Sequence, residues 1–403
     1  MVLFRKSQLA IEYSYRTRDK SPNTWVFWVH ASTAARFEEG YRTIAETVKF
    51  DGWDRPETNI LNQVRNWLRD EKNGPWVMIV DNADDEEVFF RKSSDYGVAQ
   101  EGRSLSNFLP QTTNGSIIIT SRRQDVAFRL TGRRSDIIEI KPMDEGRAIA
   151  LLGRKLPEAF EMADAIQLAR SLDHMPLALT QAAAYITQNS WLVTLSKYLQ
   201  KLEGDKDRER LLRKDLGDVR RDEEASNAIM DTWAISFDYI RKVHPSAARL
   251  LSLMSLFDRQ GIPQSLLLEE YKADDKEDAD LDDDMYTLVN YSLVMVNVHG
   301  NEFEMHRLVQ VSTKAWLQKS HELETWVEKY VNMINIAFPD GIYENWTICQ
   351  GLFPHACIVL SYQPKKLNFV HYWTSILTKA ATYSRTKGKY EQAEEMNRVA
   401  LSG

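Results

Sequence analysis

Two residues near the amino terminus, Lys6 and Ser7, could bind a phosphate and its metal ion. They match the last two residues of the phosphate-binding sequence GxxxxGK(S/T), in which the lysine neutralises the β and γ phosphates and the hydroxyl ligates magnesium. A lysine followed by a serine is common in any chain, so the pair also fits an ordinary helix start. It predicts a nucleotide site only if other residues agree with it.

Polar residues follow two apolar runs at positions that agree with such a site. Four apolar residues after Trp76 lead to Asp81, and the run GSIIITSR ends in Thr120, Ser121 and Arg122. A doubly wound parallel sheet gathers its ligands at the carboxyl ends of its strands. We therefore expect the Asp81 carboxylate beside the metal ion and the forked Arg122 cation within reach of a γ-phosphate. The other interpretation of each run is a buried core strand that is simply followed by polar residues where the chain leaves the sheet.

Short apolar runs alternate with amphipathic stretches up to about Lys141, which is typical of parallel strands covered by helices on both faces. The predicted strands are Trp25–Val29, Trp76–Val80, Ile117–Ile119 and Ile137–Ile140. The predicted helices lie near Ser7–Arg18, Thr33–Val48 and Thr58–Glu71. Residues 1–142 are thus predicted to form a doubly wound α/β domain.

Helical spacing replaces the strand pattern after Met143 and predicts a small helical domain over 143–203, with Asp144 capping its first helix. The mixed charges of 204–226 favour a solvated linker over a binding face. Residues 227–320 hold helices, two strand-like runs, 293–298 and 302–305, and a last helix, which predicts a winged helix. Residues 321–403 are predicted to be helical and to end in one tetratricopeptide-like repeat.

The acidic run Asp274–Asp284 invites a calcium interpretation, because Asp278, Asp280 and Asp282 have the spacing of an EF-hand loop. The loop needs a glycine at its sixth position and a glutamate at its twelfth, and this chain has Asp283 and Val289 there. An exposed loop is the preferred interpretation.

The composition excludes several classes of protein. A formal net charge of −7 argues against a protein that coats nucleic acid or an anionic membrane without specificity. The apolar stretches fall short of the ~20 residues of a membrane span, and the first residues leave no room for a signal peptide. With only Cys349 and Cys357, no disulfide framework is expected. We expect a cytoplasmic protein that binds neither membrane nor nucleic acid.

Taken together, six segments resemble NB-ARC domains of the STAND class of P-loop proteins, particularly fungal NLR-like ones joined to tetratricopeptide repeats. The segments occur in the family's order: KSQLAIEYSYR, VFWVHAS, WVMIVDNADD, GSIIITSR, HMPLALTQAAAYI and FEMHRLVQ. The resemblance implies a multi-domain protein with a P-loop α/β domain, a helical domain, a winged helix and a repeat sensor. It also implies an ADP- or ATP-binding switch that uses magnesium.

The resemblance assigns roles to individual residues. Lys6 and Ser7 resemble the phosphate and magnesium positions, Asp81 the Walker B acid, and Arg122 the sensor arginine. Of these, Ser7 and Asp81 would hold the metal, and Asp81 would be the residue of any catalysis.

Two more roles fall outside the α/β domain. Pro176 resembles the proline of the GLPL motif near the adenine, and His306 resembles the histidine that holds the ADP β-phosphate in the closed switch. A histidine that merely caps the last helix of the winged helix is the other interpretation of His306.

Departures from the family concern the same functions. No glycine precedes Lys6, and without one the backbone can neither turn tightly nor approach the phosphates. The family's first strand, expected in the middle of the sheet, is missing as well. Asn82 follows Asp81 where many relatives carry a second acid, and Arg307 replaces an aspartate after His306. We expect a chain truncated at both ends, with nucleotide binding impaired.

Three functions compete. The first is a signal-transduction switch that hydrolyses ATP slowly at most, exchanges ADP for ATP and assembles with itself when ATP is bound. The second is a scaffold that binds no nucleotide and recruits proteins through its helical repeats, and the missing glycines favour it. A DNA-reading winged helix is the third, although the EFEMHRLVQ segment supplies few cations.

Overall fold

The computed structural model describes residues 5–54, 59–91, 104–140, 143–156, 160–204, 223–273, 280–297 and 300–402. Its elements fall into two compact units, which are described separately. The α/β unit comprises the described residues of Phe4–Ile140, Phe338–Gln363 and Val370–Gly403, and the helical unit those of Lys141–Ala337 and Pro364–Phe369. No helix in the described part of the chain is long and apolar enough to cross a membrane.

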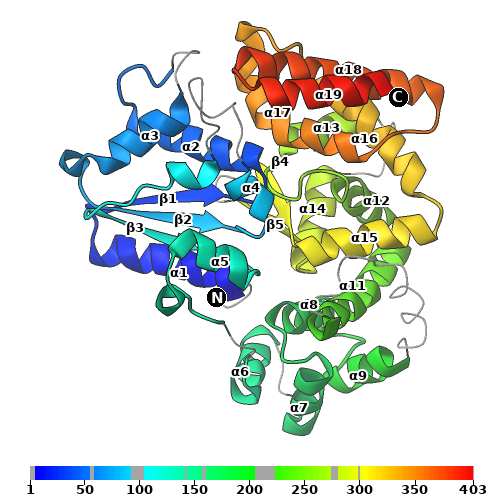
Figure 1. The fold of residues 1–403 in the computed structure, drawn as a ribbon. Coiled ribbons are helices and arrows are strands. Elements are labelled where there is room, and N and C mark those ends of the chain that lie inside the picture. The colour runs from blue at the N-terminus through cyan, green and yellow to red at the C-terminus, as the bar shows by residue number, and fades with distance from the viewer. Residues whose placement is uncertain are drawn as a thin grey trace. The chain divides into compact units, whose positions relative to one another are not determined.

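The α/β unit contains a small parallel sheet with helices on both faces (Figure 1). Its strands are β1 (Trp25–His30), β2 (Trp76–Asp81) and β3 (Gly115–Ile119). Its helices are α1 (Arg5–Lys20), α2 (Ala34–Val48), α3 (Ile60–Arg69), α4 (Glu86–Phe90), α5 (Gln124–Thr131), α17 (Trp346–Ile358), α18 (Leu367–Thr386) and α19 (Tyr390–Ser402). Short 3₁₀ turns occupy Glu71–Asn73, Leu105–Phe108, Arg134–Asp136, Tyr343–Asn345 and Val359–Ser361.

The strands pair in the order β1-β2-β3, and both pairs are parallel. Every residue of the central strand β2 is buried, which explains its continuous apolar run WVMIV. The helices α2 and α3 pack on one face around Phe37, Tyr41 and Val64, whereas Ala10 of α1 packs on the other face against Ile79. Three predicted strands and the helices between them are therefore confirmed.

The fourth predicted strand, Ile137–Ile140, is wrong. These residues form no strand, and the Ile138 side chain is 83% exposed. A strand is stabilised by its ladder partners, and β3 pairs only with β2 among the described residues. Residues of β3 are accordingly only half-buried or exposed, in contrast to those of β2. An apolar run can satisfy the strand pattern and still have no neighbour with which to pair.

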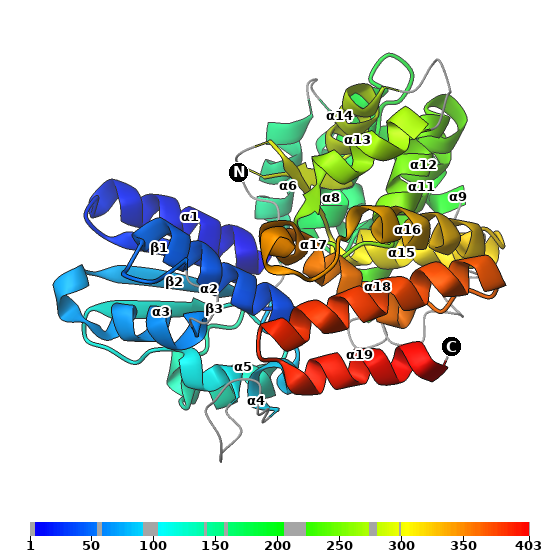
Figure 2. The same ribbon diagram turned by 90° about the horizontal axis from the view of Figure 1, so that it is seen from above.

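The last helices belong to the α/β unit rather than to a separate compact unit. Helices α18 and α19 lie side by side (Figure 2), joined at Gly388, which has a φ of 76° that glycine adopts without strain. Gly341 lies so close to α18 that an added Cβ would be 2.5 Å from the Tyr383 backbone nitrogen. The helix–turn–helix form agrees with the prediction for this segment, and the repeat family stays a prediction.

The helical unit holds the remaining elements. Its helices are α6 (Glu145–Lys155), α7 (Met162–Ser171), α8 (Pro176–Gln188), α9 (Leu195–Gly204), α11 (Glu223–Val243), α12 (Pro245–Met254), α13 (Gln264–Ala273), α14 (Leu281–Asn290), α15 (Arg307–Lys319) and α16 (Leu323–Ala337). Its strands are β4 (Ile262–Pro263), β5 (Val294–Val296) and β6 (Glu302–Met305). The predicted cap holds, because the Asp144 carboxylate accepts a hydrogen bond of 2.7 Å from the Arg147 backbone N–H.

The strands of the helical unit form an antiparallel sheet in the order β4-β6-β5. The two predicted strand-like runs are thus present as the antiparallel strands β5 and β6, and helix α15 follows them. Most of the predicted linker and the start of the acidic run lie outside the described residues. The end of that run is helical rather than a loop: Asp280 caps α14, and Asp284 is buried where Ser246 and Tyr271 donate hydrogen bonds to it.

Candidate functional site

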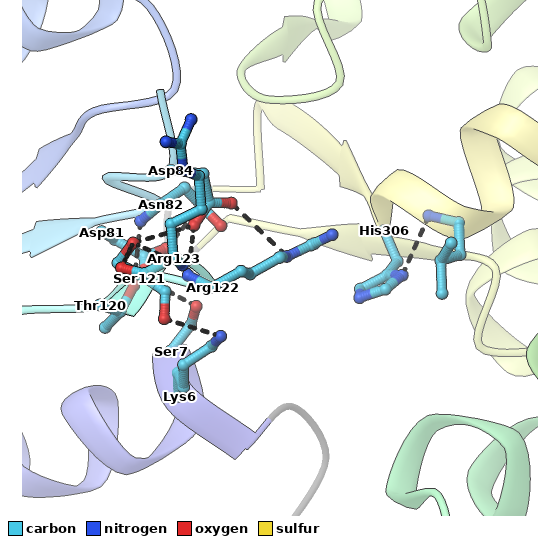
Figure 3. A network of polar contacts seen from close by, with 11 residues as sticks. Lys6, Ser7, Asp81, Asn82, Asp84, Thr120, Ser121, Arg122, Arg123 and His306 are labelled. Carbon is cyan, nitrogen blue, oxygen red and sulfur yellow. Dashed lines mark hydrogen bonds and ion pairs between the residues drawn. The ribbon is translucent and has the colours of Figure 1, made fainter. Parts of the chain in front are cut away.

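The Asp81 carboxylate is the centre of a group of polar side chains at the carboxyl end of β2 (Figure 3). Its Oδ1 accepts hydrogen bonds from Ser7 Oγ at 2.7 Å and from Thr120 Oγ1 at 2.6 Å. Its Oδ2 accepts one from Asn82 Nδ2 at 2.9 Å. Asp81 is only 3% exposed, so these three donors replace the water that a carboxylate would otherwise bind.

Backbone pairing places Asp81 and Thr120 beside each other. The parallel ladder aligns Val80 with Ile119, and Thr120 N donates to Val80 O at 2.9 Å. One residue further, Ala83 N donates to Thr120 O at 2.8 Å. The ends of β2 and β3 are therefore held in register, as parallel strands that share an edge require.

Lys6 and Ser7 reach this edge from the first turn of α1. Lys6 Nζ donates to Ser121 O at 2.9 Å. Ser121 directly follows Thr120, which contacts Asp81. Ala10 of the same helix is buried against Val77 and Ile79, and this contact fixes α1 over the sheet. The structure thus brings together three of the predicted site residues, Lys6, Ser7 and Asp81, from segments about 75 positions apart in the chain.

Asn82 has a left-handed backbone with a φ of 62°, a conformation that asparagine tolerates better than most residues. In this conformation its N–H donates to Thr120 Oγ1 at 2.9 Å while its side chain donates to Asp81. The amide therefore supplies a hydrogen bond where a second acid would place a like charge. Asn82 orients the Asp81 carboxylate and cannot itself take a proton from water.

The predicted sensor arginine, Arg122, is held by Asp84 in the loop after β2. Its backbone N–H donates to Asp84 Oδ1 at 2.6 Å, and its Nε lies 3.5 Å from Asp84 Oδ2. Arg123, the next residue, pairs with Glu86 and Asp125, and its hydrogen bond lowers the pKa of the Asp125 carboxyl to about 2. Arg122 is thus at the predicted edge of the sheet, where it forms an ion pair with Asp84 rather than with Asp81.

The other two predicted residues, Pro176 and His306, belong to the helical unit. Pro176 is buried at the first position of α8, where proline fits because it needs no helical N–H partner. His306 caps α15 by accepting a hydrogen bond of 3.2 Å from Leu308 N at its ring Nδ1. The capping interpretation of His306 therefore describes a contact that it makes.

The described residues contain no cluster of three or more His, Cys, Asp or Glu side chains that could hold a metal ion. Magnesium needs no such cluster, because it keeps several waters and usually takes one or two protein ligands beside substrate phosphates. The Ser7 hydroxyl donates its proton to Asp81, and its oxygen still has lone pairs for a cation. The residues present therefore fit a magnesium ion that is bound together with a phosphate.

Sequence reasoning did not assign roles to Thr120, Asn82 and Asp84 in this group. Their signal is visible in hindsight, since Asn82 follows directly on β2, Thr120 follows directly on β3, and Asp84 lies in the loop after β2. What the sequence does not show is which hydroxyl or amide turns toward Asp81. That choice depends on the register of β2 and β3 and on the left-handed turn at Asn82.

Comparison with known proteins gives one relative that aligns with nearly the whole chain. A nucleotide-binding leucine-rich repeat (NLR)-like protein of Hyaloscypha variabilis is 32% identical over an alignment of 403 positions that covers 98% of this chain. The same alignment covers 40% of the relative, so the chain spans less than half of that protein's length.

Two further similarities were found. Residues 239–322 match a family model described as Domain of unknown function (DUF7779), which begins within α11 and ends just after α15. Among solved structures, the Walker-type ATPase PABY2304 of Pyrococcus abyssi aligns with 72% of this chain and 83% of its own at 12% identity. Its TM-score of 0.28 is too low to establish a shared fold.

Proposed function

We propose that the α/β unit binds ADP or ATP with magnesium at the Lys6–Ser7–Asp81 group, as part of an NB-ARC-type signalling switch. The observation that carries the proposal is the 2.7 Å hydrogen bond from Ser7 to Asp81, together with the hydrogen bond from Lys6 to the Ser121 carbonyl just after β3. A buried carboxylate that orients a hydroxyl ligand is the support that a bound metal ion requires. The relative from Hyaloscypha variabilis is described as a nucleotide-binding NLR-like protein, which agrees with this function.

Each residue would have one task. The Lys6 ammonium would leave the Ser121 carbonyl to neutralise phosphate oxygens, and the Ser7 hydroxyl would ligate magnesium while Asp81 keeps its orientation. Magnesium would supply charge neutralisation between neighbouring phosphates. Arg122 would exchange part of its pairing with Asp84 for a γ-phosphate. Asn82 offers no base for water, so hydrolysis would be slow at most.

The remaining assignments are proposals that rest on the resemblance alone. In them, a winged helix is formed around β5, β6 and α15, Pro176 packs near the adenine, and His306 binds the ADP β-phosphate in the closed state. The helices from α16 onward would begin a tetratricopeptide array that recruits proteins, and the ATP state would self-assemble.

A scaffold that binds no nucleotide is the alternative. The specific observation in its favour is that no glycine precedes Lys6, so the loop whose N–H groups cradle phosphates is not provided by residues 1–5. Binding by this chain is therefore expected to be weak. In the scaffold, the group around Asp81 would be only a buried polar network that joins α1 to the sheet.

Calorimetric titration with magnesium ADP and magnesium ATP separates the two functions. We expect weak binding by the chain and a further loss of at least ~10-fold, or about 1.4 kcal/mol, for Lys6→Ala. The matched control is Lys20→Ala at the other end of α1, which removes the same charge far along the helix from Asp81. Binding that is equal in both variants, or no binding by the unchanged chain at high nucleotide concentration, would favour the scaffold.

A further inference from the structure

A second group of charged residues lies in the α/β unit, where α2 meets the carboxyl-terminal helices. We name it the α2 seam: Glu38 and Arg42 of α2, Trp346 of α17, and Lys387 and Lys389 of the turn between α18 and α19. The Lys389 ammonium forms an ion pair with Glu38. Lys387 Nζ lies over the Trp346 ring, 3.3 Å from its centroid. Residues more than 300 positions apart thus form one charged surface.

Positive charge exceeds negative charge in the α2 seam. Lys389 is neutralised by Glu38, and the neighbouring Arg36 pairs with Glu39 at 2.7 Å. Neither Arg42 nor Lys387 has a carboxylate within ion-pair distance in the described ranges. The aromatic face of Trp346 attracts the Lys387 cation without cancelling its charge.

The excess of positive charge affects the pKa of Lys387. Burial first, then the nearby Arg42 and Lys389 cations, lower the pKa of Lys387 to about 7. Other titratable neighbours cannot compensate: burial raises the pKa of Cys349 to about 11 and the pKa of Tyr383 further still, so both are uncharged near neutral pH. Asp340 and Lys379 also face Cys349 and add one charge of each sign.

We propose that Arg42, Lys387 and Lys389 form a binding site for a phosphate-type oxyanion. A doubly charged anion there would offset the two unneutralised cations and relieve their mutual repulsion. Arg42 would supply a forked donor and the two lysines point charges, which is the usual composition of such a site. The anion could be free phosphate or a phosphoryl group on an organic ligand, and both present the same oxygens.

Protonation and anion binding are coupled at this site. Without an anion, the folded protein resists protonation of Lys387, so stability falls as pH decreases from about 10.5 toward about 7 and is then constant. An anion favours the protonated lysine. Its affinity should therefore rise as pH falls through the same range, which a fixed, permanently charged site would not show.

Thermal unfolding in sulfate and in chloride at equal ionic strength tests the site, because sulfate keeps its double charge across this range. We expect sulfate to raise the unfolding temperature more at about pH 6.5 than at about pH 9. Lys387→Met and Arg42→Met should lose this pH-dependent increment and keep only the general stabilisation by sulfate. Lys387→Met removes a repelled charge, so it should fold.

Two controls separate this site from the nucleotide site. Lys6→Met should keep the full increment, and so should Lys365→Met, which removes an exposed cation of the helical unit. Phosphate and a nucleoside monophosphate, titrated in parallel, show whether the phosphoryl group must be free. An increment that survives in Lys387→Met, or disappears in Lys6→Met, would overturn the proposal for the α2 seam.

Discussion

At the scale of single residues, Thr120 joins Asp81 to the turn that follows β2, although the sequence assigned it no role. Its hydroxyl donates to Asp81 Oδ1 at 2.6 Å and accepts from Asn82 N at 2.9 Å. Asp81 is buried and Asn82 is half-buried, so the contact with Asp81 replaces one with water. The meeting of Asp81 and Ser7 could be predicted from sequence, because a doubly wound sheet gathers such residues at the carboxyl ends of its strands. The contact of Thr120 with Asp81 could not be predicted, because many other hydroxyl side chains in the sequence could have occupied that position.

Thr120→Val should destabilise the α/β unit by about 1–3 kcal/mol, because an isosteric methyl leaves the buried Asp81 carboxylate and the half-buried Asn82 N–H without that partner. Urea unfolding measures the change. Thr113→Val is the matched control, since the Thr113 hydroxyl donates to Glu71 at an exposed position and its loss should be nearly neutral. Equal effects of the two substitutions would contradict the network described around Asp81.

At the scale of elements, periodicity predicted the helices and the strands with neighbours. It succeeded at Trp76–Val80, where a fully buried strand needs an unbroken apolar run. It failed at Ile137–Ile140, because strand formation depends on a partner elsewhere in the chain. It also missed that α17 to α19 belong with the α/β unit, since contacts across more than 300 positions leave no local pattern.

Close packing between strands gives the element-scale prediction. Gly115 of β3 pairs with Trp76 of β2, and an added Cβ would lie 2.0 Å from the Trp76 ring. Trp76 cannot retreat freely, because it is buried and its Nε1 donates to Leu68 O at 2.8 Å. We expect Gly115→Ala to cost about 1–3 kcal/mol or more in the free energy of unfolding.

Gly351 in α17 provides the opposite case in the same unit. Nothing lies within 4 Å of its added Cβ, and it is exposed in a helix. Gly351→Ala should therefore stabilise by about 0.5–1 kcal/mol. Chemical denaturation of both variants tests the pair, and a harmless Gly115→Ala would show that the register of β2 and β3 is misassigned.

At the scale of the whole molecule, the proposed switch needs a contact that depends on the bound nucleotide. A ligand shifts an equilibrium only through unequal contacts with the two states. His306 is the proposed contact to the ADP β-phosphate, and it is also the cap of α15. A substitution that removes both roles at once would therefore confuse signalling with stability.

Comparison of His306→Ala with His306→Asn separates these roles. Asparagine can still cap a helix, whereas alanine costs about 1 kcal/mol there. If His306 holds ADP, both variants should bind ADP more weakly, leave ATP affinity nearly unchanged and enlarge the radius of gyration in solution scattering. If it is only a cap, the asparagine variant should behave like the unchanged chain, and that result would refute the proposed contact between His306 and ADP.

The proposed nucleotide site depends on Ser7, oriented by Asp81, to hold the magnesium of a bound nucleotide. The most direct measurement is the ratio of ADP affinities with magnesium and with excess chelator, in the unchanged chain, in Ser7→Ala and in Ser14→Ala. Ser14 lies in the same helix, and its hydroxyl donates to Ile11 O within that helix. Magnesium should strengthen ADP binding in the unchanged chain and in Ser14→Ala, and it should have little effect in Ser7→Ala. An equal effect of magnesium on ADP affinity in all three proteins would show that Ser7 does not hold the metal ion.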